Sequence, residues 1–179
     1  MRSVFTLVLI ATAALAFAQQ STTAVQQVDL SLTNIIRIRF ANNNSQTGNL
    51  VDIPLNNVGD LLNGVTSTNQ NLAVASTKPF NVNVKASSNA FSYTGGTQVN
   101  TQMQVDDVLK LKVNLNNTGG TVGSGFTSFK PITDSEQNLI NGGDNGVNKV
   151  FRIRYKAKPG MGYAGGNYLT SVIYTATQQ

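Results

Sequence analysis

The sequence predicts an all-β fold, an antiparallel β-sandwich of about 7–9 strands in a single domain. Two observations lead to this prediction: apolar and polar residues alternate over many short runs, and segments rich in Gly and Asn separate these runs. Alternation with a period of two puts one face of each strand in a core and the other in water, which is typical of antiparallel sheets. Gly and Asn readily adopt the positive φ angles of tight turns.

Each predicted element follows from one such run. In VLKLKVNL, we expect Leu109, Leu111, Val113 and Leu115 to face the core. One segment, NNVGDLLNGV at 56–65, has apolar residues at helical spacing and predicts a short helix that ends at a glycine. The predicted strands are VDLSL at 28–32, IIRIRF at 35–40, LAVAS at 72–76, FNVNVKA at 80–86, VLKLKVNL at 108–115, FTSFKPI at 126–132, VFRIRYKAK at 150–158 and YLTSVIYTAT at 168–177.

The start of the chain is typical of a secretory signal peptide. Arg2 is followed by an apolar run from Val4 to Leu15 and then by the sequence Ala-Phe-Ala at 16–18. The run is shorter than the roughly 20 residues that a membrane-spanning helix needs, so we predict no membrane span. The expected organisation is a signal peptide at 1–18, an N-terminal extension at 19–27 and a sandwich at 28–179, located outside the cell or on its surface.

The missing residue types argue against catalysis. The chain has no Cys, no His and no Trp, and its only Glu is Glu136. Ser-His-Asp and Cys-His mechanisms are therefore excluded, and the commonest metal ligand is absent. The segment NGGDNGVN at 141–148 offers a single carboxylate, Asp144, which favours a plain turn over a Ca²⁺ loop. We predict no enzyme activity, no cofactor and no catalytic or metal site.

Cations recur at every second position of three predicted strands. In VFRIRYKAK they alternate with Phe151, Ile153 and other apolar residues, which is the pattern of a strand with one solvated face. If the three strands were neighbours in one sheet, the cations would instead form a face for an anionic polymer such as a cell-surface polysaccharide. Both interpretations stay open, and we predict no nucleic-acid partner. The cations are Arg37, Arg39, Lys110, Lys112, Arg152, Arg154, Lys156 and Lys158.

One tyrosine stands out from the others. Most tyrosines occur at strand spacing, which is typical of core residues, whereas Tyr163 lies in the Gly-rich segment PGMGYAGGNY. We expect this turn to be exposed, so Tyr163 is a second candidate for contact with a polysaccharide.

Three segments resemble a known class of exported domains. These are VQQVDLSLT at 25–33, NLAVASTKPFNVNVKASSNAF at 71–91 and AGGNYLTSVIYTATQQ at 164–179. They are similar to the first strand, the mid-domain strand pair and the last strand of immunoglobulin-like pilin and coat domains, including archaic chaperone–usher pilins and spore coat protein U-like domains. The resemblance implies an immunoglobulin-like sandwich that polymerises by donor-strand exchange, in which an N-terminal segment of one subunit completes the sheet of the next.

The resemblance places the donor strand in QQSTTAVQQ at 19–27 or in a longer segment that runs on to Leu32. The sequence departs from the class here, because few apolar residues precede the first strand; if 28–32 is the donor, the run 35–40 must be the first strand of the body. The implied partners are copies of the chain or related subunits, a periplasmic chaperone and an usher. We therefore expect a structural, self-associating subunit of a filament, pilus-like fibre or coat; the alternative is a secreted module that binds polysaccharide. The candidate donor residues are Thr23, Val25, Val28, Leu30 and Leu32.

Overall fold

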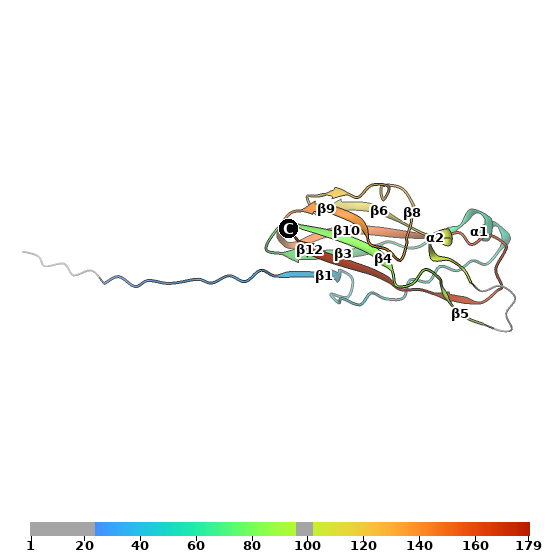
Figure 1. Ribbon diagram of the computed structural model, residues 1–179, viewed down its shortest axis with the longest axis horizontal. Helices are drawn as coiled ribbons and strands as arrows, with labels where there is room; N and C mark the ends of the chain where they lie inside the picture. Colours follow the sequence, from blue (N-terminus) through green and yellow to red (C-terminus); the bar gives the residue numbers. More distant parts are fainter. Residues whose placement is uncertain (1–23, 96–101) are drawn as a thin grey trace, which may run out of the picture. The chain divides into compact units, whose positions relative to one another are not determined.

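The computed structural model describes residues 24–95 and 102–179. The chain divides into two units, Met1–Leu32 and Thr33–Gln179. The second unit is an antiparallel β-sandwich (Figure 1), which confirms the predicted fold class. Its described residues form seven strands of at least five residues and five shorter ones.

The strands form two main sheets and one small one, and every strand pair is antiparallel. The first sheet has the order β1 (Ile36–Phe40), β3 (Gln70–Ser76), β10 (Gly146–Ala157), β6 (Leu109–Asn117) and β8 (Lys130–Pro131), and β2 (Val65–Thr66) also pairs with β10. The second has the order β12 (Val172–Gln178), β4 (Phe80–Ala86), β9 (Gln137–Gly143) and β7 (Thr121–Val122). The small sheet pairs β5 (Ser92–Thr94) with β11 (Asn167–Leu169).

The core lies between the two main sheets. Phe80, Phe126 and Phe151 are fully buried, together with aliphatic residues from β3, β4, β6, β9 and β10. The predicted inward faces of FNVNVKA and VFRIRYKA are confirmed, because their alternate residues are buried or nearly so. The chain has no cysteine and therefore no disulfide, so burial of this apolar core is a main source of its stability.

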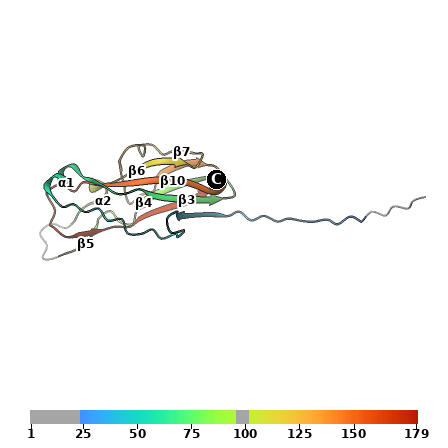
Figure 2. The ribbon, with the colours of Figure 1, turned by 180° about the vertical axis from the view of Figure 1, so that it is seen from behind.

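The predicted helix at 56–65 is confirmed as α1 (Val58–Asn63). The Asn57 side chain accepts a hydrogen bond from the Asp60 amide at 2.9 Å, and Gly64, with a φ of 79°, ends the helix. A second short helix, α2 (Val105–Val108), precedes β6. Figures 1 and 2 show α1 and the β5–β11 pair at the end of the sandwich away from the C-terminus.

Leu115 is an exception to the predicted inward face of β6. The pairing between β6 and β10 shifts by one residue between Arg152 and Ile153, so Leu115 lies opposite Arg152 on the outer face and is 37% exposed. A β-bulge inserts one residue into the alternation and moves the following side chains to the other face.

Three other predicted strands differ from the structure. YLTSVIYTAT is divided into β11 and β12, which belong to different sheets. FTSFKPI forms a strand only at Lys130–Pro131. Phe126 is buried in the core, but it follows a turn at Gly125, whose φ is 85°, and does not belong to a strand. Residues 28–32, which alternate perfectly, form no strand, since no neighbouring strand pairs with them. The compact unit accordingly begins at Thr33.

Candidate functional site

The candidate site is the open side of the sandwich, where β1 and β12 lie at the edges of their sheets. The two strands neighbour each other (Figure 1), yet no pairing joins them among the described residues. Each strand therefore has one edge that forms no strand ladder. An edge of this kind can accept a further strand.

The backbone hydrogen bonds show which residues of β12 face the free edge. Ser171 accepts from the Ser87 amide at 2.9 Å, and the Gln179 amide donates to the Pro79 carbonyl at 2.9 Å, so odd-numbered residues bond toward β4. Bonding alternates along an antiparallel strand. The amides and carbonyls of Val172, Tyr174, Ala176 and Gln178 consequently point to the free edge.

The backbone hydrogen bonds of β1 alternate in the same way. Ile35 accepts from the Thr77 amide at 3.0 Å and the Ala41 amide donates to the Asn71 carbonyl at 2.8 Å, so odd-numbered residues bond toward β3. The free edge then carries the even-numbered residues of β1. The Phe40 amide is satisfied by the Ser45 carbonyl at 2.7 Å, which leaves the backbone groups of Ile36 and Ile38 open.

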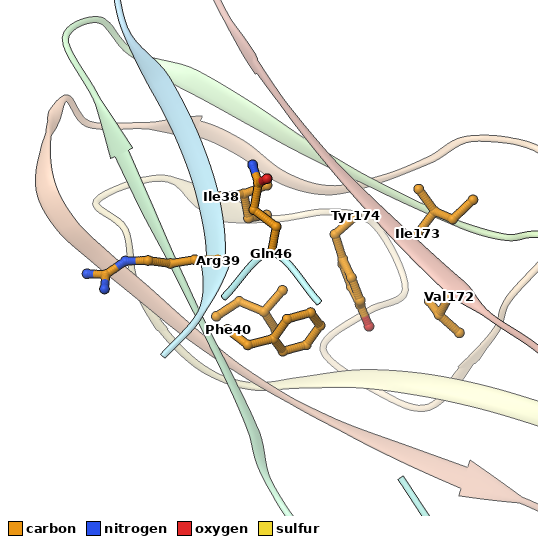
Figure 3. A pocket seen from close by; sticks show the side chains of 8 residues that line it. Ile38, Arg39, Phe40, Gln46, Val172, Ile173 and Tyr174 are labelled. Carbon is orange, nitrogen blue, oxygen red and sulfur yellow. The ribbon is translucent and has the colours of Figure 1, made fainter. Parts of the chain in front are cut away.

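A cleft of about 220 Å³, lined by apolar residues together with Arg39 and Gln46, lies between these two strands (Figure 3). The rings of Phe40 and Tyr174 meet edge to face across it, with centroids 6.2 Å apart. One end of the seam is closed, because the Gln178 side chain donates to the Ile35 carbonyl at 2.8 Å. The cleft is lined by Ile38, Arg39, Phe40, Gln46, Leu72, Val172, Ile173 and Tyr174.

A pair of tyrosine hydroxyls lies beneath the cleft and joins the two sheets. The Tyr155 and Tyr174 hydroxyl oxygens are 2.6 Å apart, one from β10 and the other from β12. Burial raises the pKa of Tyr155 to about 12, although its bond to Tyr174 opposes part of this shift. Burial also raises the pKa of Tyr174 well above its usual value, and so do the charge and the hydrogen bond of Tyr155. Both hydroxyls therefore stay protonated at neutral pH.

The segment at 24–32 presents apolar side chains to solvent. Val28, Leu30 and Leu32 are 72%, 80% and 87% exposed, and they share one face of an extended chain. Val25 is 89% exposed but falls on the opposite face, so the predicted donor residues do not form one continuous apolar row. The remaining candidate, Thr23, lies outside the described residues.

The predicted cations lie in one sheet. β10 and β6 are direct neighbours, while β1 is separated from β10 by β3, and Lys158 immediately follows β10. The three cationic strands are therefore not all neighbours. β6 and β10 lie side by side, whereas β3 separates Arg37 and Arg39 from β10. Figure 3 shows the Arg39 side chain extending away from the cleft.

Tyr163 is partly buried, in contrast to its predicted exposure. It packs against the small core cluster of Met103, Val108 and Ala157 and lines a cleft of about 270 Å³ with Tyr168. The Tyr168 hydroxyl donates to the Ala164 carbonyl at 2.8 Å, which holds this Gly-rich turn against the sandwich. Tyr163 and Tyr168 therefore both hold the Gly-rich turn in place.

The described residues contain no group of three acidic side chains that could hold a metal ion. Asp144, the one carboxylate of the NGGDNGVN segment, forms an ion pair with Lys149 at 3.6 Å. Across 24–95 and 102–179, the helices are all too short to cross a membrane.

Sequence reasoning did not identify the residues of the cleft. Phe40 and Tyr174 each belong to a predicted strand, and their alternation signals an inward side chain. Strand pairing is decided by distant parts of the chain, however, so no local pattern shows that β1 and β12 lie at edges.

No family model and no curated protein matches the chain. One matching solved chain comes from a structural study of glycolipid glycan hydrolysis by a family 123 glycoside hydrolase from Clostridium perfringens. The match has 16% identity and a TM-score of 0.32, and it covers 65% of this chain and 19% of that chain. The chain thus spans about a fifth of the hydrolase.

Proposed function

We propose that the protein is a structural subunit that associates with copies of itself into an extracellular filament, pilus-like fibre or coat. In this assembly, residues 24–32 of one copy add a strand to the free edge of β12 in the next. The observation that carries the proposal is the cleft between two unpaired strand edges, which is lined by Phe40, Tyr174 and aliphatic side chains together with Arg39 and Gln46.

Strand addition would satisfy both partners. The outward backbone groups of Val172, Tyr174 and Ala176 gain hydrogen-bond partners, as in other cases in which an extended peptide joins a sheet edge. The alternate side chains Val28, Leu30 and Leu32 leave water and contact the apolar residues of the cleft. Burying one such side chain contributes about 1.5–3 kcal/mol before the loss of chain entropy is counted.

A linear fibre follows from the arrangement of donor and acceptor. They are different surfaces of the same chain, so each contact leaves one free donor and one free acceptor. Association of this head-to-tail kind continues unless a rotation closes it into a ring. Export through the signal-like start at 1–18 belongs to the same proposal and predicts a mature chain that begins at Gln19.

The experiment compares purified residues 19–179 with residues 33–179. Electron microscopy should show fibres of the longer chain and only single particles of the shorter one. A synthetic peptide of residues 24–34 should bind the shorter chain, whose acceptor edge is intact. Fibres formed equally by both chains would contradict the proposal, as would a longer chain that stays monomeric at every concentration tested.

A further inference from the structure

The outer face of the sheet β1-β3-β10-β6-β8 concentrates positive charge away from the cleft. On its central strands the outward residues are Arg152, Arg154 and Lys156 of β10 and Lys110 and Lys112 of β6. All five are only partly exposed, because their aliphatic stems lie against neighbouring side chains. We call these five residues the cationic face.

Like charges oppose each other directly on this face. Arg154 pairs with Lys112 and Lys156 pairs with Lys110 in the register of the two strands. Directly opposite side chains have Cβ atoms about 4.5–5.5 Å apart, and like charges at that position destabilise a sheet. The described residues offer no compensation, since their one ion pair joins Lys149 to Asp144. A solvated face would gain nothing from this arrangement.

The arginines are held in place by neutral groups. Arg152 donates from Nε to the Asn71 side chain at 2.8 Å, and Arg154 donates from Nε to the Ser67 carbonyl at 3.1 Å. These bonds fix one edge of each guanidinium group without cancelling its charge. The remaining N–H donors are free to form the paired hydrogen bonds with carboxylate that suit an arginine.

The side chains between the cations indicate the chemistry of the ligand. Asn69, Asn71 and Asn114 supply amide groups beside the cationic face, and amides bond readily to hydroxyl groups. The aromatic side chains of the same strands, such as Phe151 and Tyr155, face the interior. Proteins that bind single-stranded nucleic acid stack its bases on exposed aromatic rings, and the cationic face has none among its described residues.

We propose that the cationic face binds a linear acidic polysaccharide. Carboxylates of successive sugars would contact the cations of β10 and β6, which recur about every 6.6 Å along each strand, and hydroxyls would contact the asparagines. The face lies on the opposite side of its sheet from the cleft, so this binding does not depend on strand exchange.

The test uses the full mature chain and polygalacturonate as the probe. Lys112→Gln with Lys156→Gln should weaken binding about tenfold or more, because charge-assisted hydrogen bonds are lost. The matched control is Lys78→Gln with Lys85→Gln, which removes the same two charges outside the cationic face. The control should bind within about twofold of the original chain.

Thermal stability separates binding from folding. Lys112→Gln with Lys156→Gln should melt at the same temperature or higher, because two like-charge pairs are relieved. Equal losses in the two double variants would mean that net charge alone drives binding, and the proposal would be wrong. It would also be wrong if neutral dextran bound as well as polygalacturonate, or if poly(dT) bound more tightly.

Discussion

At the scale of single residues, two tyrosine hydroxyls form a hydrogen bond between the two main sheets. Tyr155 and Tyr174 carry the hydroxyls that would otherwise be unsatisfied near the core, and each satisfies the other at 2.6 Å. The pair joins β10, a central strand of the first sheet, to β12, an edge strand of the second. Burial of this pair destabilises the fold only when one of the two hydroxyls must ionise.

The first prediction concerns stability at high pH. The folded pKa of Tyr155 is about 12, against an ordinary value of 10.0, so above pH 10 the unfolded chain releases its proton while the folded chain keeps it. The contribution of Tyr155 to the free energy of unfolding should therefore be constant below pH 10 and should fall by about 2–3 kcal/mol between pH 10 and 12. Tyr155→Phe with Tyr174→Phe should lose less stability over the same range. Urea titrations at each pH measure the difference, and identical slopes in both proteins would contradict the assignment.

The second prediction concerns a close contact between backbones. A Cβ atom on Gly123 would lie 2.0 Å from the Asn138 carbonyl oxygen, so Gly123→Ala must push β7 away from β9. We expect a loss of at least about 2 kcal/mol in the free energy of unfolding. Gly165→Ala is the matched control, because a Cβ there meets no atom within 4 Å. A control as unstable as Gly123→Ala would show that the effect is not steric.

At the scale of secondary-structure elements, the alternation of apolar and polar residues predicted which segments form strands. It did not predict which strands pair or which residues lie opposite each other. FNVNVKA and VFRIRYKA became β4 and most of β10 because their buried faces repeat without interruption. The bulge that turns Leu115 outward depends on the partner strand, which the local sequence does not contain. For the same reason the sequence could show cations on β6 and β10 but not that Arg154 lies opposite Lys112.

The third prediction concerns the free edge of β12. Among the described residues of 33–179, no strand pairs with the amide hydrogens of Val172, Tyr174 and Ala176, whereas those of Ile173 and Thr175 bond toward β4. Hydrogen exchange followed by NMR should therefore be at least about tenfold faster for the first set. Adding the peptide of residues 24–34 should slow exchange in that set alone. Slowing of exchange across the whole sandwich would indicate general stabilisation and would contradict strand addition at β12.

At the scale of the whole molecule, the sequence established the class of fold but not the site. Composition and period-two alternation sufficed for an antiparallel sandwich, since both are local properties. The cleft between Phe40 and Tyr174 arises because the two sheets end side by side with their edges unpaired, and this is a property of the topology. The alternating residues 28–32 show the reverse case, in which a strand-like sequence pairs with no strand among the described residues of its own chain.

The last prediction tests whether that unpartnered segment finds its strand in another copy. Val28→Asp with Leu30→Asp places two charges on the apolar face of the extended segment, where strand addition would bury them without partners. Gln27→Asp with Ser31→Asp adds the same two charges to the opposite face, which would remain in water. Sedimentation should show the first variant as a monomer and the second as an assembled fibre. Because the two variants carry equal charge and leave Thr33–Gln179 unchanged, loss of assembly in both would point to electrostatic repulsion between copies. Loss of assembly in the first variant alone would show that the cleft binds the side chains of Val28 and Leu30.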